Sequence, residues 1–153
     1  MTGVQTCALP ISGGTLVLTD ELVAVAEPDA LLGVLAHELG HVQRRHATRM
    51  AVEGSLLGAA VAVISGDPTS VLATVPVALA TLSFSRRHEV EADCFALQTL
   101  ARAGQPPEPL ARLLERISQG QSGGADVLSS HPSTPERVQL LRDAATAKNV
   151  CQL

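Results

Sequence analysis

The stretch His37-Glu38-Leu39-Gly40-His41 lies within a run of apolar residues that recur at helical spacing. On a helix, the two histidines are one turn apart on the same face, and Glu38 lies beside the first. Two imidazoles placed in this way can bind a zinc ion, and the carboxylate between them can serve as the base that activates water. Gly40 indicates close packing against a neighbouring element. The stretch therefore predicts a packed helix that carries a metal site.

The elements around this stretch are predicted from local signals. Residues 15–19 (Thr-Leu-Val-Leu-Thr) read as a short strand. Pro28 suits the first turn of the metal-site helix, which is expected to run past Met50. Residues 51–84 are strongly apolar, and Gly66-Asp67-Pro68 divides them into two runs. Each run is shorter than the roughly 20 residues that cross a bilayer. We therefore expect two buried or partly exposed helices, with a membrane hairpin as the alternative.

The C-terminal half is also expected to be helical. Pro76 should kink or interrupt the second apolar run. A helix over residues 83–102 is expected to end at Gly104, and a short amphipathic helix should follow over 109–118. Residues 119–130 are rich in Gly and Ser and read as a flexible loop. The last helix is expected to begin at Ser133-Thr134-Pro135-Glu136, which has the spacing of a capping box.

Composition limits the class of protein. The 153 residues fit one domain, and 46% of them are hydrophobic. The aromatic residues are Phe84 and Phe95 alone, so the core must consist of aliphatic side chains on closely packed helices. The net charge is −4, and the sequence has no basic cluster larger than the pairs Arg44-Arg45 and Arg86-Arg87. This distribution excludes a nucleic-acid-binding surface.

Residues 1–12 carry no charge and no periodic pattern, and they look like a translated sequencing adapter. We interpret them as a non-native segment, set them aside from the fold prediction, and expect the natural N-terminus to be missing. Cys7 falls in this segment. Cys94 and Cys151 are too few for a disulfide framework, and Cys94 is expected to be a small buried hydrophobic residue.

A catalytic zinc ion needs a third protein ligand. The acidic stretch that follows His88 offers candidates on a predicted helix. Glu89 and Asp93 are four residues apart and share a face, whereas Glu91 lies roughly 200° round the helix from Glu89. One carboxylate of the sharing pair can bind zinc while the other accepts a hydrogen bond from a ligand histidine.

Three motifs in this order resemble the HtpX heat-shock and CAAX prenyl endopeptidase family of gluzincin zinc metallopeptidases. They are His37-Glu38-Leu39-Gly40-His41, then residues 85–93 (Ser-Arg-Arg-His-Glu-Val-Glu-Ala-Asp), then residues 131–138 (His-Pro-Ser-Thr-Pro-Glu-Arg-Val). The resemblance implies a zincin-like metallopeptidase core that is mainly α with a small β element. It also implies that residues 13–148 are an N-terminally truncated catalytic domain, followed by a tail at 149–153.

The resemblance also implies a role for each site residue. His37, His41 and Glu89 bind one zinc ion per chain. Glu38 is the general base, and Asp93 orients a ligand histidine.

His131 and Arg137 are implied to lie near the cleft and to hold the substrate or the oxyanion. The chain has no tyrosine for that purpose, which leaves His131, Arg137 or a backbone amide. In some relatives the histidine that matches His131 reaches the metal, where it would act as a gate. His46 and His88 match no ligand of the family and are expected at the surface.

These inferences predict a zinc endopeptidase that hydrolyses peptide bonds of proteins or peptides, in quality control at the bacterial cell envelope. A periplasmic or inner-membrane-associated location is expected, with membrane contact through residues 51–84 or through a missing N-terminal anchor. The alternative is a non-catalytic, zinc-binding chaperone-like or adaptor domain of the same fold. Glu38 favours the enzyme, because a pure binding site needs no base beside its ligand.

Overall fold

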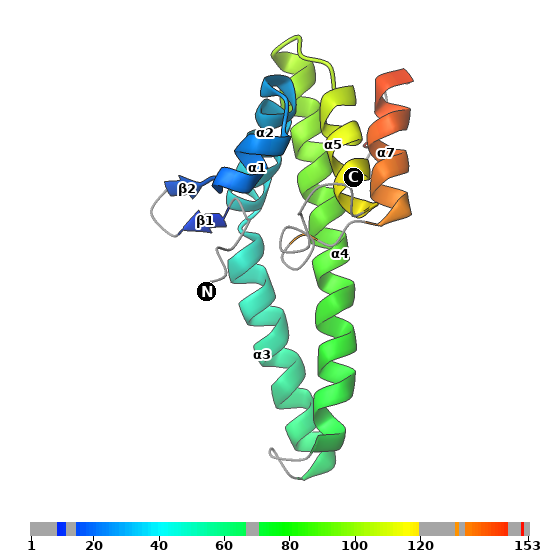
Figure 1. The fold of residues 1–153 in the computed structure, drawn as a ribbon. Coiled ribbons are helices and arrows are strands. Elements are labelled where there is room, and N and C mark those ends of the chain that lie inside the picture. The colour runs from blue at the N-terminus through cyan, green and yellow to red at the C-terminus, as the bar shows by residue number, and fades with distance from the viewer. Residues whose placement is uncertain are drawn as a thin grey trace.

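The structure is a computed structural model that describes residues 9–11, 15–66, 71–119, 131, 134–146 and 151. Helices dominate it, and the described strands form one two-stranded antiparallel sheet (Figure 1). The predicted class, mainly α with a small β element, is confirmed. In chain order the elements are β1 Leu9–Ile11, β2 Thr15–Val17, α1 Asp20–Val25, α2 Pro28–Gln43, α3 His46–Ser65, α4 Val71–Arg102, α5 Glu108–Ser118 and α7 Pro135–Thr146.

The sheet contains the predicted strand and one that was not predicted. β2 falls within the expected range 15–19, and it pairs with β1 so that Leu9 lies opposite Val17. β1 belongs to the segment 1–12 that we had set aside from the fold, so that exclusion missed a strand. The non-native origin of the segment stays a prediction. The short helix α1 was also missed, although Thr19 caps it by accepting a hydrogen bond from the backbone N–H of Leu22.

The core is formed where α2 packs on α4 and α5, and α5 packs on α7. A Cβ atom on Gly40 would lie 3.1 Å from the Cα and carbonyl oxygen of Ala92 in α4. The predicted close approach at Gly40 is thereby confirmed, and it brings the metal-site helix against the acidic stretch. The buried aliphatic side chains of this core include Ala36, Ala96, Leu97, Leu100, Leu110, Leu114 and Leu141.

Two predicted helix boundaries were wrong. The metal-site helix does not run past Met50, because α2 ends at Gln43 and Arg45 has a left-handed backbone with φ of 53°. The chain turns there and starts α3 at His46. At the other boundary, α4 begins at Val71 instead of residue 83 and continues through Pro76. Pro76 lies near the start of α4, where its missing N–H removes one helical hydrogen bond without ending the helix.

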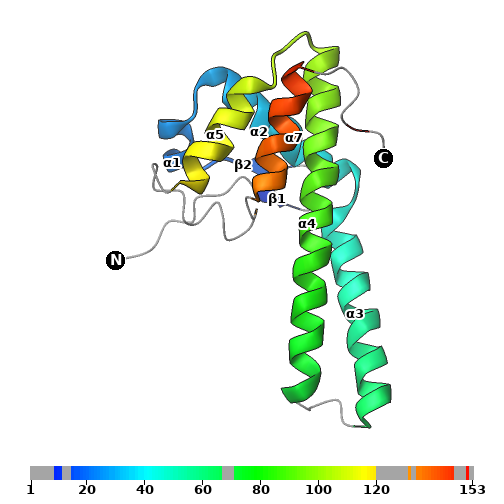
Figure 2. The same ribbon diagram turned by 90° about the vertical axis from the view of Figure 1, so that its right-hand side faces the viewer.

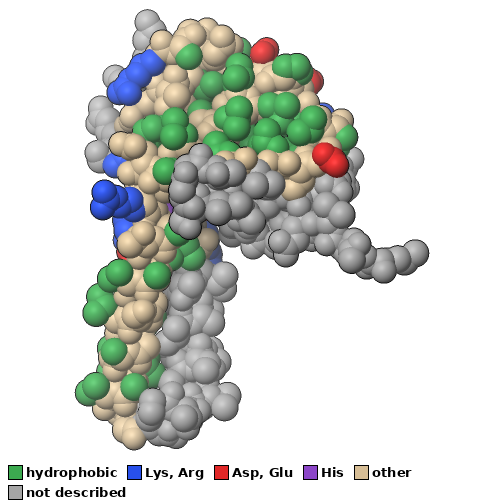
Figure 3. All heavy atoms as spheres, turned by 90° about the vertical axis from the view of Figure 1, so that its left-hand side faces the viewer, with side chains coloured by type: hydrophobic (Ala, Val, Ile, Leu, Met, Phe, Trp, Pro, Cys, Tyr) green, Lys and Arg blue, Asp and Glu red, His purple; other side chains and the backbone are tan. Residues whose placement is uncertain are grey.

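Helices α3 and α4 form an antiparallel hairpin that projects away from the body of the molecule (Figures 1 and 2). Apolar side chains are exposed along α3 (Figure 3), and Val63 and Ile64 near its C-terminal end are 83% and 86% exposed. Within the described residues, His46–Ile64 is long and apolar enough to cross a membrane, and no residue of its apolar 18-residue window is buried in the protein. The expectation of a partly exposed helix is confirmed for α3.

The C-terminal predictions are mostly confirmed. Gly104, with φ of +67°, follows the end of α4, and α5 matches the predicted amphipathic helix. Residues 120–130 and Ser133 lie outside the described residues. The expectation about cysteines was wrong: Cys94 is buried as predicted, but it forms a disulfide with Cys151, with the two Cα atoms 5.5 Å apart. Spacing alone could not show that residue 151 returns to α4.

Candidate metal centre

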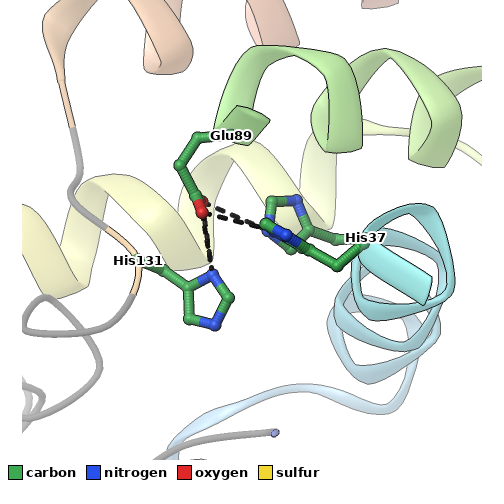
Figure 4. A group of neighbouring side chains, drawn as sticks. His37, Glu89 and His131 are labelled. Carbon is green, nitrogen blue, oxygen red and sulfur yellow. Dashed lines mark hydrogen bonds and ion pairs between the residues drawn. The ribbon is translucent and has the colours of Figure 1, made fainter. Parts of the chain in front are cut away.

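Four side chains from three parts of the chain converge beside the Gly40 contact. α2 supplies His37 and His41 one turn apart. α4 supplies Glu89, and His131 comes from the segment before α7; Figure 4 shows these two residues with His37. The candidate ligand atoms of these four residues all lie within 4.8 Å of one another. The structure therefore brings together the three predicted zinc ligands and adds His131 to the group.

The three predicted ligands point at one another. Nε2 of His37 lies 3.0 Å from Nε2 of His41. The carboxylate of Glu89 faces both rings: its Oε2 lies 3.3 Å from Nε2 of His37, and its Oε1 lies 3.3 Å from Nε2 of His41. Two imidazole nitrogens and one carboxylate make up the ligand set that catalytic zinc ions take in hydrolases. The chemistry of the donor atoms thus fits a zinc ion.

Glu38 provides a second test of this fit. Its side chain is buried, and its Oε2 has no hydrogen-bond partner among the described residues. A buried carboxylate oxygen without a partner is costly, so such an atom calls for a ligand or a water molecule. Burial raises the pKa of Glu38 above its usual value. The position and the pKa both suit a base that accepts a proton from a water molecule at the metal site.

Asp93 holds the outer nitrogen of His37, as predicted for a carboxylate that orients a ligand histidine. Its Oδ1 lies 2.8 Å from Nδ1 of His37. Arg137 donates two hydrogen bonds to the same carboxylate, 2.6 Å from Nε and 2.9 Å from Nη2. Burial alone would raise the pKa of Asp93, but the hydrogen bonds from Arg137 and His37 hold it below its usual range. Asp93 is therefore an anionic acceptor at neutral pH.

Arg137 is buried, and it forms an ion pair with Glu89 as well as with Asp93. Its Nη1 lies 2.8 Å from Oε2 of Glu89. The positive guanidinium group thus offsets the negative charges of Glu89 and Asp93. Without it, these two carboxylates would be buried with too little positive charge beside them. The predicted role of Arg137 toward the substrate oxyanion stays a prediction.

His131 lies between Glu89, the candidate third ligand, and Glu38, the candidate base. Its Nδ1 is 3.2 Å from Oε1 of Glu89, and its Nε2 is 3.4 Å from Oε1 of Glu38. Burial would raise the pKa of Glu89, but hydrogen bonds from His131, His37 and His41 hold it far below its usual value. His131 is close enough to the candidate ligands to reach a metal ion bound there, as the predicted gate would require. That role also stays a prediction.

A cavity of about 60 Å³ adjoins the site. Its polar lining residues are His37, Glu38, Asp93, His131 and Arg137, and the rest of the lining is aliphatic. The aliphatic residues are Leu22, Val34, Leu110, Leu113, Leu114, Ile117 and Leu141. An apolar side chain could therefore lie next to the candidate base.

The expectation that His46 and His88 are surface residues was wrong. Both are 1% exposed, and their rings stack with centroids 4.5 Å apart. His46 also contacts a predicted ligand, since its Nδ1 lies 3.0 Å from Nδ1 of His41. Burial lowers the pKa of His46 to about 4, so its ring is neutral at pH 7. The helix break at Arg45 is what brings His46 against His41, because on one continuous helix residues five apart do not face each other.

Glu91 points away from the metal-site face, as its place on the helix predicted. One of its oxygens lies 2.6 Å from Nη1 of Arg49 and 3.3 Å from Nε2 of His46. Glu91 therefore belongs to the interface between α3 and α4.

A mainly helical, zincin-like core with two histidines and a glutamate at one point is the architecture of a metallopeptidase. The sequence profile of peptidase family M48 matches residues 7–145, and the chain belongs to that family. This match and the relatives confirm the predicted resemblance to the HtpX and CAAX prenyl endopeptidase family. A Protease HtpX homolog of Halobacterium salinarum is 34% identical over 128 residues, which cover 73% of this chain and 43% of the relative.

Two further relatives carry other names. The Beta-barrel assembly-enhancing protease of Escherichia coli is 28% identical over 90% of this chain and 32% of its own length. The Mitochondrial metalloendopeptidase OMA1 of Arabidopsis thaliana is 31% identical over 90% of this chain and 29% of its own length. The chain thus spans less than half of each of these three proteases. No solved structure matches the chain.

Proposed function

We propose that this chain is the catalytic part of a zinc endopeptidase that hydrolyses peptide bonds in proteins or peptides. The observation that carries the proposal is the meeting of His37, His41 and Glu89 beside a buried Glu38 whose Oε2 lacks a partner. Membership in peptidase family M48 and relatives that are all named as proteases support it.

Each residue of the site has a role in this proposal. His37, His41 and Glu89 would hold one zinc ion, which when bound would polarise the scissile carbonyl and lower the pKa of a water molecule. Asp93 fixes the ring of His37, and Arg137 holds the carboxylates of Asp93 and Glu89 in place.

Proton transfer is assigned to Glu38. Its carboxylate takes a proton from the attacking water and passes it to the leaving amine, which a base buried at the cavity edge is placed to do. His131 lies beside it and is the better-placed donor for the negative charge that develops on the carbonyl oxygen, because Arg137 is already engaged by two carboxylates. The aliphatic cavity favours a substrate with an apolar side chain next to the scissile bond.

The structure also supports a location at the cell envelope. A disulfide between Cys94 and Cys151 favours an oxidising compartment such as the periplasm. The exposed apolar length of α3 suits contact with a membrane, because 20 helical residues span about 30 Å, the thickness of a bilayer core. We propose that the protein is located at the cell envelope and contacts the bilayer through helix α3 of the hairpin.

The alternative is a non-catalytic domain of the same fold that binds zinc and holds client proteins. It would use the same ligands, but it would not need Glu38. The distinction therefore rests on turnover and not on metal binding.

The test compares wild type with Glu38→Gln in a casein or peptide cleavage assay, with the zinc content of each sample measured. The proposal expects both to carry zinc and only wild type to cleave, with the variant slower by at least about 100-fold. Equal turnover in the two, or no turnover in either with zinc at full occupancy, would support the non-catalytic alternative.

A further inference from the structure

We propose that His46 is a positioning residue that fixes the ring of the ligand His41, as Asp93 fixes that of His37. The inference rests on the proposed zinc site. It assigns a hydrogen-bond partner to the proposed ligand His41, for which the sequence analysis named no partner. Nε2 of His41 faces His37 and Glu89. Its Nδ1, on the other side of the ring, lies 3.0 Å from Nδ1 of His46.

The positions of the protons follow from the contacts. A neutral imidazole carries one proton, so a histidine that offers Nε2 to a metal carries that proton on Nδ1. Nδ1–H of His41 then donates to Nδ1 of His46, which must be unprotonated. The proton of His46 is left on Nε2, 3.3 Å from Oε2 of Glu91, and it is donated there. Each ring nitrogen in the row therefore has one consistent role.

Glu91 anchors the far end of this row. Its Oε2 accepts a hydrogen bond of 2.6 Å from Arg49, one turn after His46 on α3. Burial of His46 keeps water from competing for the contact with His41. The row thus runs from Arg49 through Glu91 and His46 to His41.

The backbone explains why His46 reaches His41 at all. Along one continuous helix, residues five apart would lie roughly 140° from each other around the axis. The left-handed conformation of Arg45 breaks the helix, and α3 starts again with His46 as its first residue. The turn between α2 and α3 therefore places a second supporting side chain at the metal site, against the outer nitrogen of His41.

Loss of such a partner typically weakens metal binding by about 10- to 100-fold. We would measure the zinc dissociation constant by competition with a chromophoric chelator, for wild type, His46→Phe and His46→Gln. Phenylalanine keeps a buried ring and removes both nitrogens, whereas glutamine keeps an acceptor oxygen and a donor N–H. His46→Phe should bind zinc about 10- to 100-fold more weakly, and His46→Gln should recover part of the loss.

His88→Phe is the matched control. His88 is as buried as His46 and stacks on it, but its ring nitrogens have no hydrogen-bond partner among the described residues. Its variant should keep the wild-type zinc affinity. The absorption spectrum of the cobalt-substituted protein gives a second measurement, and it should change in His46→Phe and stay unchanged in His88→Phe.

Three results would overturn the inference. One is wild-type zinc affinity in a folded His46→Phe, and another is an equal loss in His88→Phe. The third is a folded wild-type chain that binds no zinc, which would remove the proposed zinc site as well. If His46→Phe does not fold, Glu91→Ala decides: it should fold and bind zinc several-fold more weakly, and unchanged affinity would contradict the row.

Discussion

Oδ1 of Asp93 lies 2.8 Å from Nδ1 of His37, although 56 residues separate the two in the chain. Glu89 lies one turn before Asp93 on α4, and its carboxylate faces Nε2 of the His37 ring. Helix α4 therefore supplies both a candidate ligand and a carboxylate that contacts the outer nitrogen of another candidate ligand on α2. The contact at Gly40 lets the two helices approach closely enough for both interactions.

Asp93→Asn should weaken zinc binding by about 10- to 100-fold, because a neutral amide is a poorer acceptor for Nδ1–H of His37. The variant also leaves Arg137 with less compensation, so the free energy of unfolding should fall. Chelator competition and urea unfolding measure the two effects. Asp143→Asn, an exposed change on α7, should alter neither, and an equal effect at both positions would refute the assigned role of Asp93.

Gly40→Ala should destabilise the protein by about 1–3 kcal/mol, because the new methyl group would press on the backbone of Ala92. Gly58→Ala on α3 is its matched control. No atom lies within 4 Å of the added methyl group there, so alanine should stabilise the helix by up to about 1 kcal/mol. Chemical unfolding of both variants checks the pair, and similar effects of the two substitutions would contradict the close packing at Gly40.

The metal-free protein should lose stability as the pH falls from 7 to 5, in part through His46. Burial, with the nearby His41 adding to it, lowers the pKa of His46 to about 4, whereas the unfolded chain titrates near 6.5. Between these values the unfolded state binds more protons, so the free energy of unfolding rises with pH. This one group should account for about 2 kcal/mol over that interval.

His37 titrates in the opposite direction, because Asp93 and Glu89 outweigh burial and raise its pKa. The contribution of His46 is therefore isolated by comparison with His46→Phe. Urea unfolding at pH 7 and pH 5 should show that wild type loses about 2 kcal/mol more than the variant. An identical pH dependence in the two proteins would mean that His46 is not a buried neutral ring.

Reduction of the disulfide between Cys94 and Cys151 should lower the free energy of unfolding. The bridge closes a loop over a sequence separation of 57 residues, for which the entropic account gives a loss of up to about 4 kcal/mol. Unfolding with and without a reductant measures it. Cys151→Ser should be as unstable as reduced wild type and insensitive to the reductant. Two titratable thiols in the untreated, folded protein would contradict the bridge.

The relative orientation of the candidate site residues could be predicted from the sequence, because the spacing of residues on a helix is a local property. His37 and His41 share a face on any helix, and so do Glu89 and Asp93, while Glu91 must point away. All five side chains lie as these periodicities require.

Features that depend on chain reversal were missed. The break at Arg45 carries no glycine or proline, and a non-glycine residue in a left-handed conformation leaves no reliable mark in a sequence. Because the chain turns at this break, His46 is buried against His41 instead of being exposed. The bridge from Cys94 to Cys151 likewise depends on where the tail returns, and the position of Arg137 behind Glu89 depends on how α7 packs.

Metal content tests the central claim most directly. We would measure zinc per chain by elemental analysis after dialysis, for wild type, His41→Ala, Glu89→Ala and Glu38→Gln. The account predicts one zinc ion per chain in wild type and in Glu38→Gln, and a large loss in His41→Ala and Glu89→Ala. A folded wild-type chain without stoichiometric zinc, or full zinc occupancy in Glu89→Ala, would contradict it.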